Sequence, residues 1–571
     1  NIVATDSGNG NLTYRQDVIV TVNDINEEPT DISLSGNVLE EQTPAGTVVG
    51  ALSTIDPDVG DTFAYTLVAG SGDTDNASFT IVGDQLQTAV ALDSGAGASY
   101  TVRVRSTDAG ALWTEKAFTI RTSSAEVSLA DATTVLWEDT DTASRVQVAD
   151  VVVTDDAAGA NVLNLSGADA AMFEVDPASG TGGFAASLYL KAGAVLDFAA
   201  NPVLDVTVEV HSPTVGGVPN DAADLAIDLL PVLRGTPDAD VFEFIGGLPG
   251  AWTVRLNGVE HSFGPDVKDL KFDGLGGEDT ATITCTAADD TVDLSPGHGT
   301  VTGQGYDLQI DNIETITVDG GGGGPDGDVA RLRDNATAKD TLTGGPHSVT
   351  FSATGHSNQV ANFRWVHVYG TQGYDDEAVL QGASGAKDTL DAWHDHAILQ
   401  GDEYFIRTLE IFNITVDSAP GETDVAHLYD DPDTTDTFTG RPNWATLVGE
   451  GDTFFTRVNS FRNVHAHATL GGDDEALFYD DPDGVDRLDA SPDETTFEGD
   501  GFSLRTLSFR YITADSTPGS ADMAYLYDAD TDDAFKATPD WAKLSGPEFF
   551  ARANSFRYVH AFATAGTDTS R

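Results

Sequence analysis

The sequence contains one cysteine, Cys285, and two methionines in 571 residues. A single cysteine excludes an intrachain disulfide, so other interactions must cross-link the fold. No apolar run reaches the roughly 18–20 residues that a membrane helix needs, so the sequence predicts no membrane insertion within this segment. Exported bacterial proteins often lack disulfides, whereas many animal extracellular modules are rich in them. These absences favour a bacterial exported protein that uses metal in place of disulfides.

Basic residues are also few. The chain has 28 lysines and arginines against 93 aspartates and glutamates, which gives a formal net charge of −65 at pH 7. The field of so acidic a chain repels nucleic acid and anionic membranes, so nucleic acid is excluded as a partner. A compact fold at this charge repels itself unless cations neutralise it. Carboxylates are preferred ligands of calcium, so we expect calcium, and an acidic surface kept for solubility is the alternative.

Catalytic signatures are missing too. The sequence has no Gly-x-Ser-x-Gly, His-Glu-x-x-His or phosphate-loop motif, and no cysteine–histidine signature. Carboxylate pairs are so frequent that none indicates glycoside hydrolysis. A β-helix polysaccharide lyase is the enzyme alternative, but such sites cluster basic residues, which are scarce here. We therefore predict that the protein is not an enzyme.

The residues that are abundant favour an all-β protein. Residues typical of strands and turns, such as Val, Thr, Gly and Asp, are frequent, and no long stretch shows a helical period. A chain this long should divide into several domains of about 100–150 residues. The expected divisions are part of a truncated module plus a linker at 1–29, β-sandwiches at 30–124 and 125–232, a Gly/Asp-rich β region at 233–325, and β-repeats at 326–571. Both ends stop inside repeating patterns, so we expect a slice of a larger protein.

Four phrases in and before the first sandwich share an acidic, loop-like character. They are Asp24-Ile-Asn26-Glu-Glu-Pro29, Leu39-Glu40-Glu41, Ile55-Asp56-Pro57-Asp58 and Thr107-Asp108-Ala-Gly110. They resemble the linker and ligand motifs of cadherin-like repeats. The resemblance implies a Greek-key β-sandwich joined to its neighbours through calcium. The implied calcium ligands are Asp24, Asn26, Glu40, Asp56, Asp58 and Asp108, with Asp6 as the matching residue of the preceding module.

Residues 125–232 resemble a second, more divergent cadherin-like module. The phrases Leu136-Trp137-Glu138-Asp139, Val153-Thr154-Asp155-Asp156 and Leu196-Asp197-Phe198 stand in the expected order. The resemblance implies Glu138, Asp155, Asp156 and Asp197 as ligands. However, no Asp-x-Asn-x-x-Pro linker precedes this module, and Ala199 stands where the family usually carries a carboxylate. We expect weak calcium binding at this junction, or none.

The region 233–325 differs from the preceding modules in its amino-acid composition. Asp273-Gly-Leu-Gly-Gly-Glu-Asp279, Asp289-Asp290-Thr-Val-Asp293 and the run Gly320–Gly324 are rich in glycine and aspartate. They resemble degenerate forms of the nonapeptide of RTX-type β-rolls, whose turns bind calcium between short stacked strands. The resemblance implies a solenoid-like β region with calcium in its turns.

An internal repeat fills residues 326–571. Asp424-Val-Ala-His-Leu-Tyr-Asp430, Asp474-Glu-Ala-Leu-Phe-Tyr-Asp480 and Asp522-Met-Ala-Tyr-Leu-Tyr-Asp528 are three copies of one phrase, and Asp328-Val-Ala-Arg-Leu-Arg-Asp334 is a more divergent fourth. The period is about 48 residues, and alternate units are more alike. Such a period without helical patterning predicts a β-solenoid, and two rungs of about 24 residues per unit would suit a parallel β-helix.

Alternation within the repeated phrase predicts which side chains are buried. Leu428, Phe478 and Leu526 should face the core, and the tyrosine that follows each should face outward. Asp430, Asp480 and Asp528 then begin turns that could hold calcium. His394-Asp-His396 and His465-Ala-His467 place two imidazoles on one strand face, a spacing that suits a transition metal, but the sequence identifies no third ligand.

The combination of modules predicts a structural role. Similar Leu-Tyr-Asp repeats, beside cadherin-like and β-roll-like regions, resemble parts of very large secreted bacterial proteins of the planctomycete type. This implies an extracellular or cell-surface location and a structural or adhesive function. We expect self-association into a fibre or layer, or attachment to cell-surface or matrix polymers. An array of carbohydrate-binding modules is the alternative.

Overall fold

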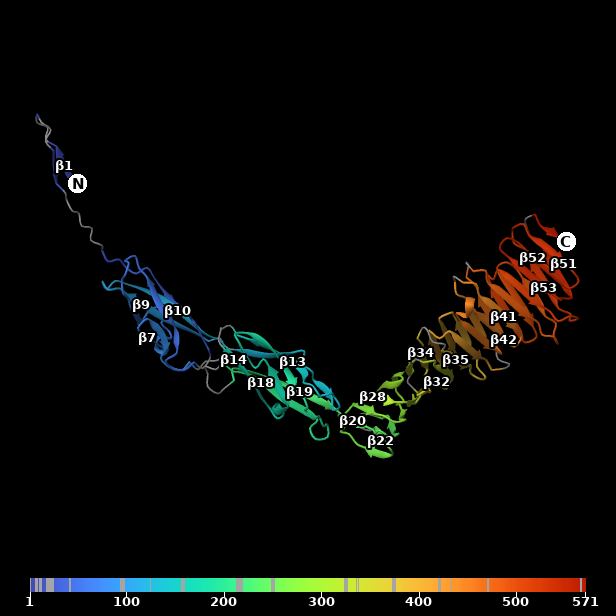
Figure 1. Ribbon diagram of the computed structural model, residues 1–571, viewed down its shortest axis with the longest axis horizontal. Helices are drawn as coiled ribbons and strands as arrows, with labels where there is room; N and C mark the ends of the chain where they lie inside the picture. The colour runs from blue at the N-terminus through green and yellow to red at the C-terminus, as the bar shows by residue number, and fades with distance from the viewer. Residues whose placement is uncertain are drawn as a thin grey trace. The chain divides into compact units, whose positions relative to one another are not determined.

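The structure is a computed structural model. It describes residues 2–5, 9, 13–16, 25–40, 43–92, 98–123, 125–155, 160–211, 219–247, 252–322, 327–334, 336, 338–371, 376–419, 423–432, 434–469, 472–564 and 567–570. The chain divides into two compact units, Asn1–Leu229 and Leu230–Arg571 (Figure 1). The helices described are three single 3-10 turns, η1 (Asn76–Ser78), η2 (Ala170–Met172) and η3 (Glu450–Asp452). Within the described ranges, no helix has the length and apolar character to span a membrane.

The first unit begins with a hairpin and continues as a β-sandwich. The hairpin pairs β1 (Ile2–Thr5) with β2 (Thr13–Gln16). One sheet of the sandwich contains, in order, β3 (Asp31–Leu34), β5 (Val48–Ile55), β8 (Gln85–Thr88) and β7 (Phe79–Val82). The other contains β4 (Val38–Glu40), β10 (Trp113–Ser123), β9 (Ser99–Thr107) and β6 (Ala64–Leu67).

This strand order is a Greek key. Its β4 strand pairs parallel with β10, whereas β10 pairs antiparallel with β9. Alternation in β9 buries Val102 and Val104, while Arg103 and Arg105 face outward and both bind Glu115. The buried side chains of the two sheets meet in one core.

A second sandwich follows in the same unit. Its first sheet contains β11 (Glu126–Ala130), β13 (Val146–Thr154), β17 (Phe184–Leu190) and β15 (Phe173–Asp176). Its second contains β12 (Val135–Trp137), β19 (Asp221–Leu230), β18 (Val203–His211), β14 (Ala160–Ser166) and β16 (Ser179–Thr181). Val151, Leu188, Val208 and Ile227 are completely buried between the sheets. The prediction of tandem Greek-key sandwiches is confirmed.

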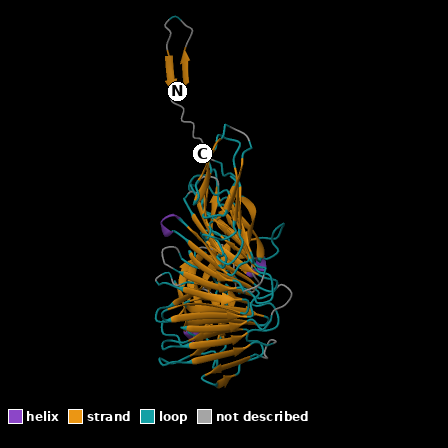
Figure 2. Ribbon diagram, turned by 90° about the vertical axis from the view of Figure 1, so that its right-hand side faces the viewer, coloured by secondary structure: helices purple, strands orange, loops and turns teal. Residues whose placement is uncertain are grey.

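The second unit is a β-solenoid made of two long sheets. The first sheet has 17 strands: β20 (Val232–Arg234), β24 (Asp269–Asp273), β26 (Thr291–Ser295), β27 (Gly297–Gly303), β28 (Tyr306–Ile313), β30 (Val329–Arg333), β34 (Trp365–Tyr369), β36 (Thr389–Ala392), β37 (His396–Gln400), β38 (Phe405–Leu409), β40 (Val425–Tyr429), β44 (Asn463–His467), β46 (Arg487–Ala490), β47 (Glu494–Gly499), β48 (Phe502–Leu507), β50 (Met523–Tyr527) and β54 (Tyr558–Phe562). The strands of the solenoid lie side by side in a ladder (Figure 2).

The second sheet has 19 strands. They are β21 (Val241–Ile245), β22 (Thr253–Leu256), β23 (Val259–His261), β25 (Thr280–Thr284), β29 (Thr315–Asp319), β31 (Thr341–Gly345), β32 (Ser348–Ala353), β33 (His356–Ala361), β35 (Glu377–Gln381), β39 (Asn413–Asp417), β41 (Thr437–Arg441), β42 (Trp444–Val448), β43 (Phe455–Asn459), β45 (Glu475–Tyr479), β49 (Tyr511–Asp515), β51 (Ala534–Ala537), β52 (Trp541–Ser545), β53 (Phe550–Asn554) and β55 (Thr569–Ser570). The solenoid predicted from the repeats is confirmed.

Each repeating unit contains five strands, which lie in three successive segments that alternate between the two sheets. In one unit, β40 lies in the first sheet, β41–β43 form an antiparallel meander in the second sheet, and β44 returns to the first. Because three is odd, the next unit begins on the opposite sheet, with β45 in the second sheet and the meander β46–β48 in the first. This explains why alternate units are more alike in sequence. The unit therefore differs from the expected two equal rungs of about 24 residues.

The same two sheets extend on both sides of residue 325. Strand β26 of the Gly/Asp-rich segment pairs parallel with β30, and β29 pairs parallel with β33. The segment 233–325 and the repeats at 326–571 thus share one pair of sheets and one continuous core. The phrase Asp273–Asp279 connects β24 to β25, whereas Asp289–Asp293 runs into β26. Of the run Gly320–Gly324, Gly323 and Gly324 lie outside the described residues.

The repeated phrase places its side chains as the alternation predicted. Leu428, Phe478 and Leu526 are completely buried, while Tyr429, Tyr479 and Tyr527 lie partly exposed on the outer face. Every five-residue copy therefore contributes two side chains to the core and three to the surface.

Candidate metal centres

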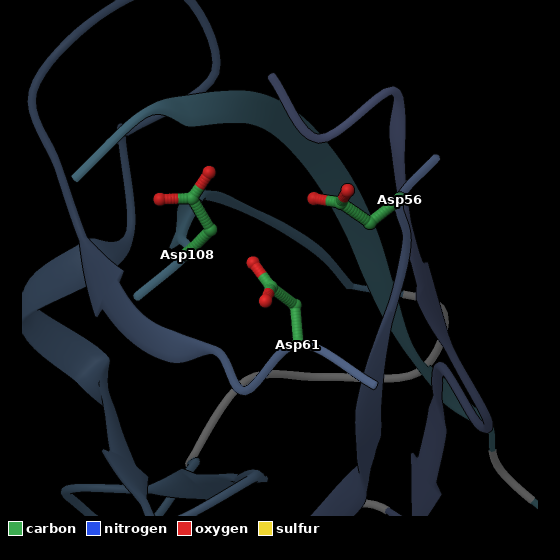
Figure 3. A group of neighbouring side chains, drawn as sticks. All are labelled: Asp56, Asp61 and Asp108. Carbon is green, nitrogen blue, oxygen red and sulfur yellow. The ribbon is translucent and has the colours of Figure 1, made fainter. Parts of the chain in front are cut away.

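Three aspartates meet at one end of the first sandwich. Asp56 follows β5, Asp61 lies in the same loop, and Asp108 follows β9. The loops come together because β6, which begins after Asp61, pairs antiparallel with β9 and places Ala64 opposite Thr107. One carboxylate oxygen from each aspartate lies within 4.8 Å of the others. Figure 3 shows the three side chains close together, with the carboxylates of Asp56 and Asp61 directed toward Asp108.

The linker before this module is bound to the same loops. The Asn26 side-chain amide donates a hydrogen bond to Asp108 Oδ2 at 2.8 Å, and the Glu27 backbone N–H donates to Asp58 Oδ2 at 2.8 Å. Gly110 permits this approach, because a Cβ atom there would lie 2.3 Å from Asn26 Oδ1. The aspartates therefore connect the linker to the sandwich.

Each of these loops also uses one carboxylate oxygen to hold its own backbone. The Asp58 N–H donates to Asp56 Oδ1 at 2.8 Å, and the Leu112 N–H donates to Asp108 Oδ1 at 2.9 Å. Within the described part of the chain, Asp56 Oδ2 and Asp61 Oδ2 are shielded from solvent and accept no hydrogen bond. Desolvation and the charges of Asp56, Asp58 and Asp108 raise the pKa of Asp61. A divalent cation would relieve both costs.

The ligands implied for this junction are only partly brought together. Asp56 and Asp108 join the cluster, and Asn26 reaches it through Asp108, whereas Asp58 holds the linker backbone. Asp61 was missed, although its position in Asp56-Pro-Asp-Val-Gly-Asp61 could have indicated it. Asp6 and Asp24 lie outside the described residues, and Glu40 is described only as a β4 backbone position opposite Ser123.

The candidate residues of the second sandwich make separate local hydrogen bonds. Glu138 accepts the Phe198 N–H at 2.9 Å, Asp155 accepts the Asn161 side-chain amide at 2.8 Å, and Asp197 accepts the Ala200 N–H at 3.0 Å. Asp156 lies outside the described residues. Among the residues described in this module, no three carboxylate or imidazole groups come within 4.8 Å of one another.

Aspartate groups recur along the solenoid. Each combines the aspartate after a unit's first strand, the one before its meander, and the one before the first strand of the next unit. The groups are Asp334–Asp340–Asp376, Asp430–Asp436–Asp474, Asp480–Asp486–Asp522 and Asp528–Asp533–Asp568.

One backbone hydrogen bond builds all four groups. The aspartate before the meander donates its N–H to the carboxylate of the next unit, as Asp436 does to Asp474 at 2.8 Å and Asp486 to Asp522 at 2.7 Å. In the unit that begins with β35, Gly382 stands in place of the first aspartate, so only Asp388 and Asp424 remain there. The sequence predicted the turns that begin at Asp430, Asp480 and Asp528, but not the hydrogen bond between aspartates of successive units.

These carboxylates are buried among like charges. Burial, followed by neighbouring aspartates, raises the pKa of Asp474 and of Asp486 to about 6. Asp486 is completely buried, and within the described structure its Oδ1 atom has no hydrogen-bond partner. A bound cation would supply the missing partner and restore the charged form.

Comparisons with known proteins give structural similarity only. No family model matches the sequence, and no curated protein matches it. Among solved structures, the chain is similar to a protocadherin gammaB7 EC3-6 cis-dimer, with 20% identity, 40% of this chain and 56% of that chain covered, and a TM-score of 0.19. It is similar to Drosophila N-cadherin EC1-4, with 16% identity, 63% and 81% covered, and a TM-score of 0.19. For the protocadherin gammaB4 extracellular domain the values are 15%, 80% and 71%, and 0.20. The chain thus spans just over half of the first of these structures.

Proposed function

We propose that this chain is an extracellular, calcium-binding structural or adhesive protein that forms part of a filament, matrix or cell-surface layer. One observation carries the proposal: the Asp56–Asp61–Asp108 cluster lies where the linker is bound to the sandwich, through Asn26 and Glu27. A calcium ion needs six to eight oxygens at about 2.3–2.6 Å, and carboxylates and amide carbonyls are suitable ligands. Calcium there would make the linker part of the module and turn a flexible joint into a stiff one.

The solenoid supports the same role. Over the residues that the structure describes, its units share one core and pair strand to strand from β20 to β55, so the region can transmit force as a single body. Four aspartate groups recur along it, and a chain with a net charge of −65 needs cations before two copies can approach. We propose a second copy of the chain, or a polymer of the surface or matrix, as the partner.

The outer face of the solenoid fits this role better than carbohydrate binding. Trp393 stacks on His396 at 4.3 Å and on Tyr429 at 4.7 Å between ring centres, and Tyr429 stacks on His467 at 4.6 Å. Trp393 and Tyr429 thus have a ring stacked on each face. A sugar ring needs an open aromatic face, so these residues do not offer a platform.

The test is limited proteolysis of the linker with and without calcium. We expect calcium to protect the bonds between Asn26 and Pro29, and chelation to expose them. Asp108→Asn should reduce this protection and weaken calcium binding measured by calorimetry. Asp84→Asn removes the same charge from an exposed turn and should leave both unchanged. Equal cleavage rates in calcium and in chelator would refute the proposal.

A further inference from the structure

Three histidines lie together on the outer face of the solenoid. His427 is in β40, and His465 and His467 are in the neighbouring strand β44. The strands pair in parallel and place His427 directly opposite His465. Alternation directs all three imidazoles outward, since the residues between them are buried. The sequence showed the His465–His467 pair but not His427, which lies one strand away.

One pair in this group, His427 and His467, has the spacing of imidazoles that share a metal ion, whereas the nitrogens of all three rings do not lie within 4.8 Å of one another, so the His465 ring must turn to join the pair. His427 Nδ1 lies 3.3 Å from His467 Nε2. The ring centre of His427 lies 5.0 Å from that of His465 and 5.5 Å from that of His467. Two imidazoles bound to one tetrahedral ion, at nitrogen–metal distances of about 2.0–2.1 Å, have ring centres about 5 Å apart.

We propose that His427, His465 and His467 form a binding site for a transition-metal ion of the zinc class. Each ring contributes one nitrogen, and the fourth position is open to water or to a side chain of a second chain. This site is separate from the aspartate groups, because imidazole nitrogen suits zinc whereas calcium takes oxygen ligands.

The surroundings orient the imidazoles. Stacking on Tyr429 fixes the plane of the His467 ring.

The charged neighbours of the site are compatible with a cation. Arg505 lies opposite His465 in β48, but Glu494 holds it in an ion pair at 2.6 Å. Asp391 lies opposite His427 in β36 and adds a carboxylate beside the site.

The chain contains a matched comparison two units further on. Strands β50 and β54 correspond to β40 and β44 and pair in the same register. There Tyr525, His560 and Phe562 stand in place of His427, His465 and His467, and the rings still stack. The fold therefore accepts tyrosine and phenylalanine at these positions, which makes His427→Tyr and His467→Phe suitable test variants.

The experiment uses the full chain in saturating calcium, so that carboxylates are occupied. Cobalt(II) is added as a spectroscopic probe, and zinc binding is measured by calorimetry. We expect the intense visible absorption of four-coordinate cobalt to saturate at one equivalent and to be removed by zinc. His427→Tyr and His467→Phe should each weaken zinc binding at least about tenfold. His560→Phe should leave it unchanged.

Two results would overturn the proposal. One is the absence of a saturable cobalt band in the unchanged chain, which would mean that His427 and His467 share only a hydrogen bond. The other is equal zinc affinity in the unchanged chain and in His467→Phe. Circular dichroism melting checks that each variant is folded, and the cobalt spectrum of the unchanged chain decides the question even if a variant is not.

Discussion

In the presence of a chelator that removes calcium, the solenoid should be more stable at pH 5 than at pH 7.5. With calcium bound, it should be more stable at pH 7.5 than at pH 5. The carboxyl groups responsible are Asp474 and Asp486, of which at most 1% is exposed. Burial and neighbouring aspartates raise their pKa from 3.8 to about 6. Because the folded-state pKa lies above the unfolded value, the folded state holds these protons more tightly. The resulting stabilisation is complete below about pH 3.8 and is lost as the pH rises through about 6.

The magnitude follows from the two pKa values. A rise from 3.8 to about 6 corresponds to about 3 kcal/mol for each carboxyl group over the whole titration, of which about 1.4 kcal/mol, or about tenfold in local opening, is lost between pH 5 and 7.5. Hydrogen exchange measures this directly, as protection of the backbone amides between residues 425 and 515. In chelator, protection should fall between pH 5 and 7.5. With calcium bound, the charged carboxylates have a partner, so protection at pH 7.5 should recover.

Two variants separate this cause from the general charge of the chain. Asp474→Asn keeps an oxygen that can accept the Asp436 N–H but cannot ionise, so it should raise protection at pH 7.5 in chelator and flatten the pH profile. Asp500→Asn removes the same charge from an exposed turn and should leave the profile as it is. If chelated protein gained protection steadily from pH 5 to 7.5, the reasoning would be wrong.

Three further predictions follow from the fold. Phe478→Ala should cost about 3–5 kcal/mol in local stability, because the ring is completely buried, and the melting temperature should fall well below that of Tyr479→Ala. Removal of one unit, residues 425–474, should disrupt the solenoid, whereas removal of two, residues 425–522, should preserve it; circular dichroism and gel filtration would tell them apart. Cys285 is buried, with a pKa raised to about 12, so it should resist thiol reagents at pH 8 until the protein unfolds.

The sequence predicted what depends on residues close together in the chain. Alternation of apolar and polar residues within five positions was enough to place Leu428 in the core and Tyr429 on the surface. Likewise, the resemblance of the acidic phrases to cadherin-like motifs implied that Asp56 and Asp108 lie in loops of a Greek-key sandwich, where the structure has them.

Contacts between distant strands could not be predicted in the same way. His427 is 38 residues from His465, and only the pairing of β40 with β44 makes them neighbours. The contact of Asp436 with Asp474 likewise depends on where the next unit begins. A period of about 48 residues fixes the length of a unit but not how many times the chain crosses between sheets. The sequence therefore did not predict the three-stranded meander.

Each unit runs through one sheet, then the other, then the first again, so the next unit starts on the opposite sheet. Successive units are therefore related by a twofold screw axis. Two units add five strands to each sheet, which is an advance of about 24 Å at a strand spacing of about 4.8 Å. One unit therefore advances about 12 Å and turns its surface to the opposite side. A filament built along this axis would expose the same surface on its two opposite sides. The copies of this surface on one side would be shifted by half a two-unit repeat relative to those on the other. Neighbouring filaments could then join on either side, and growth into a sheet would need no second kind of interface.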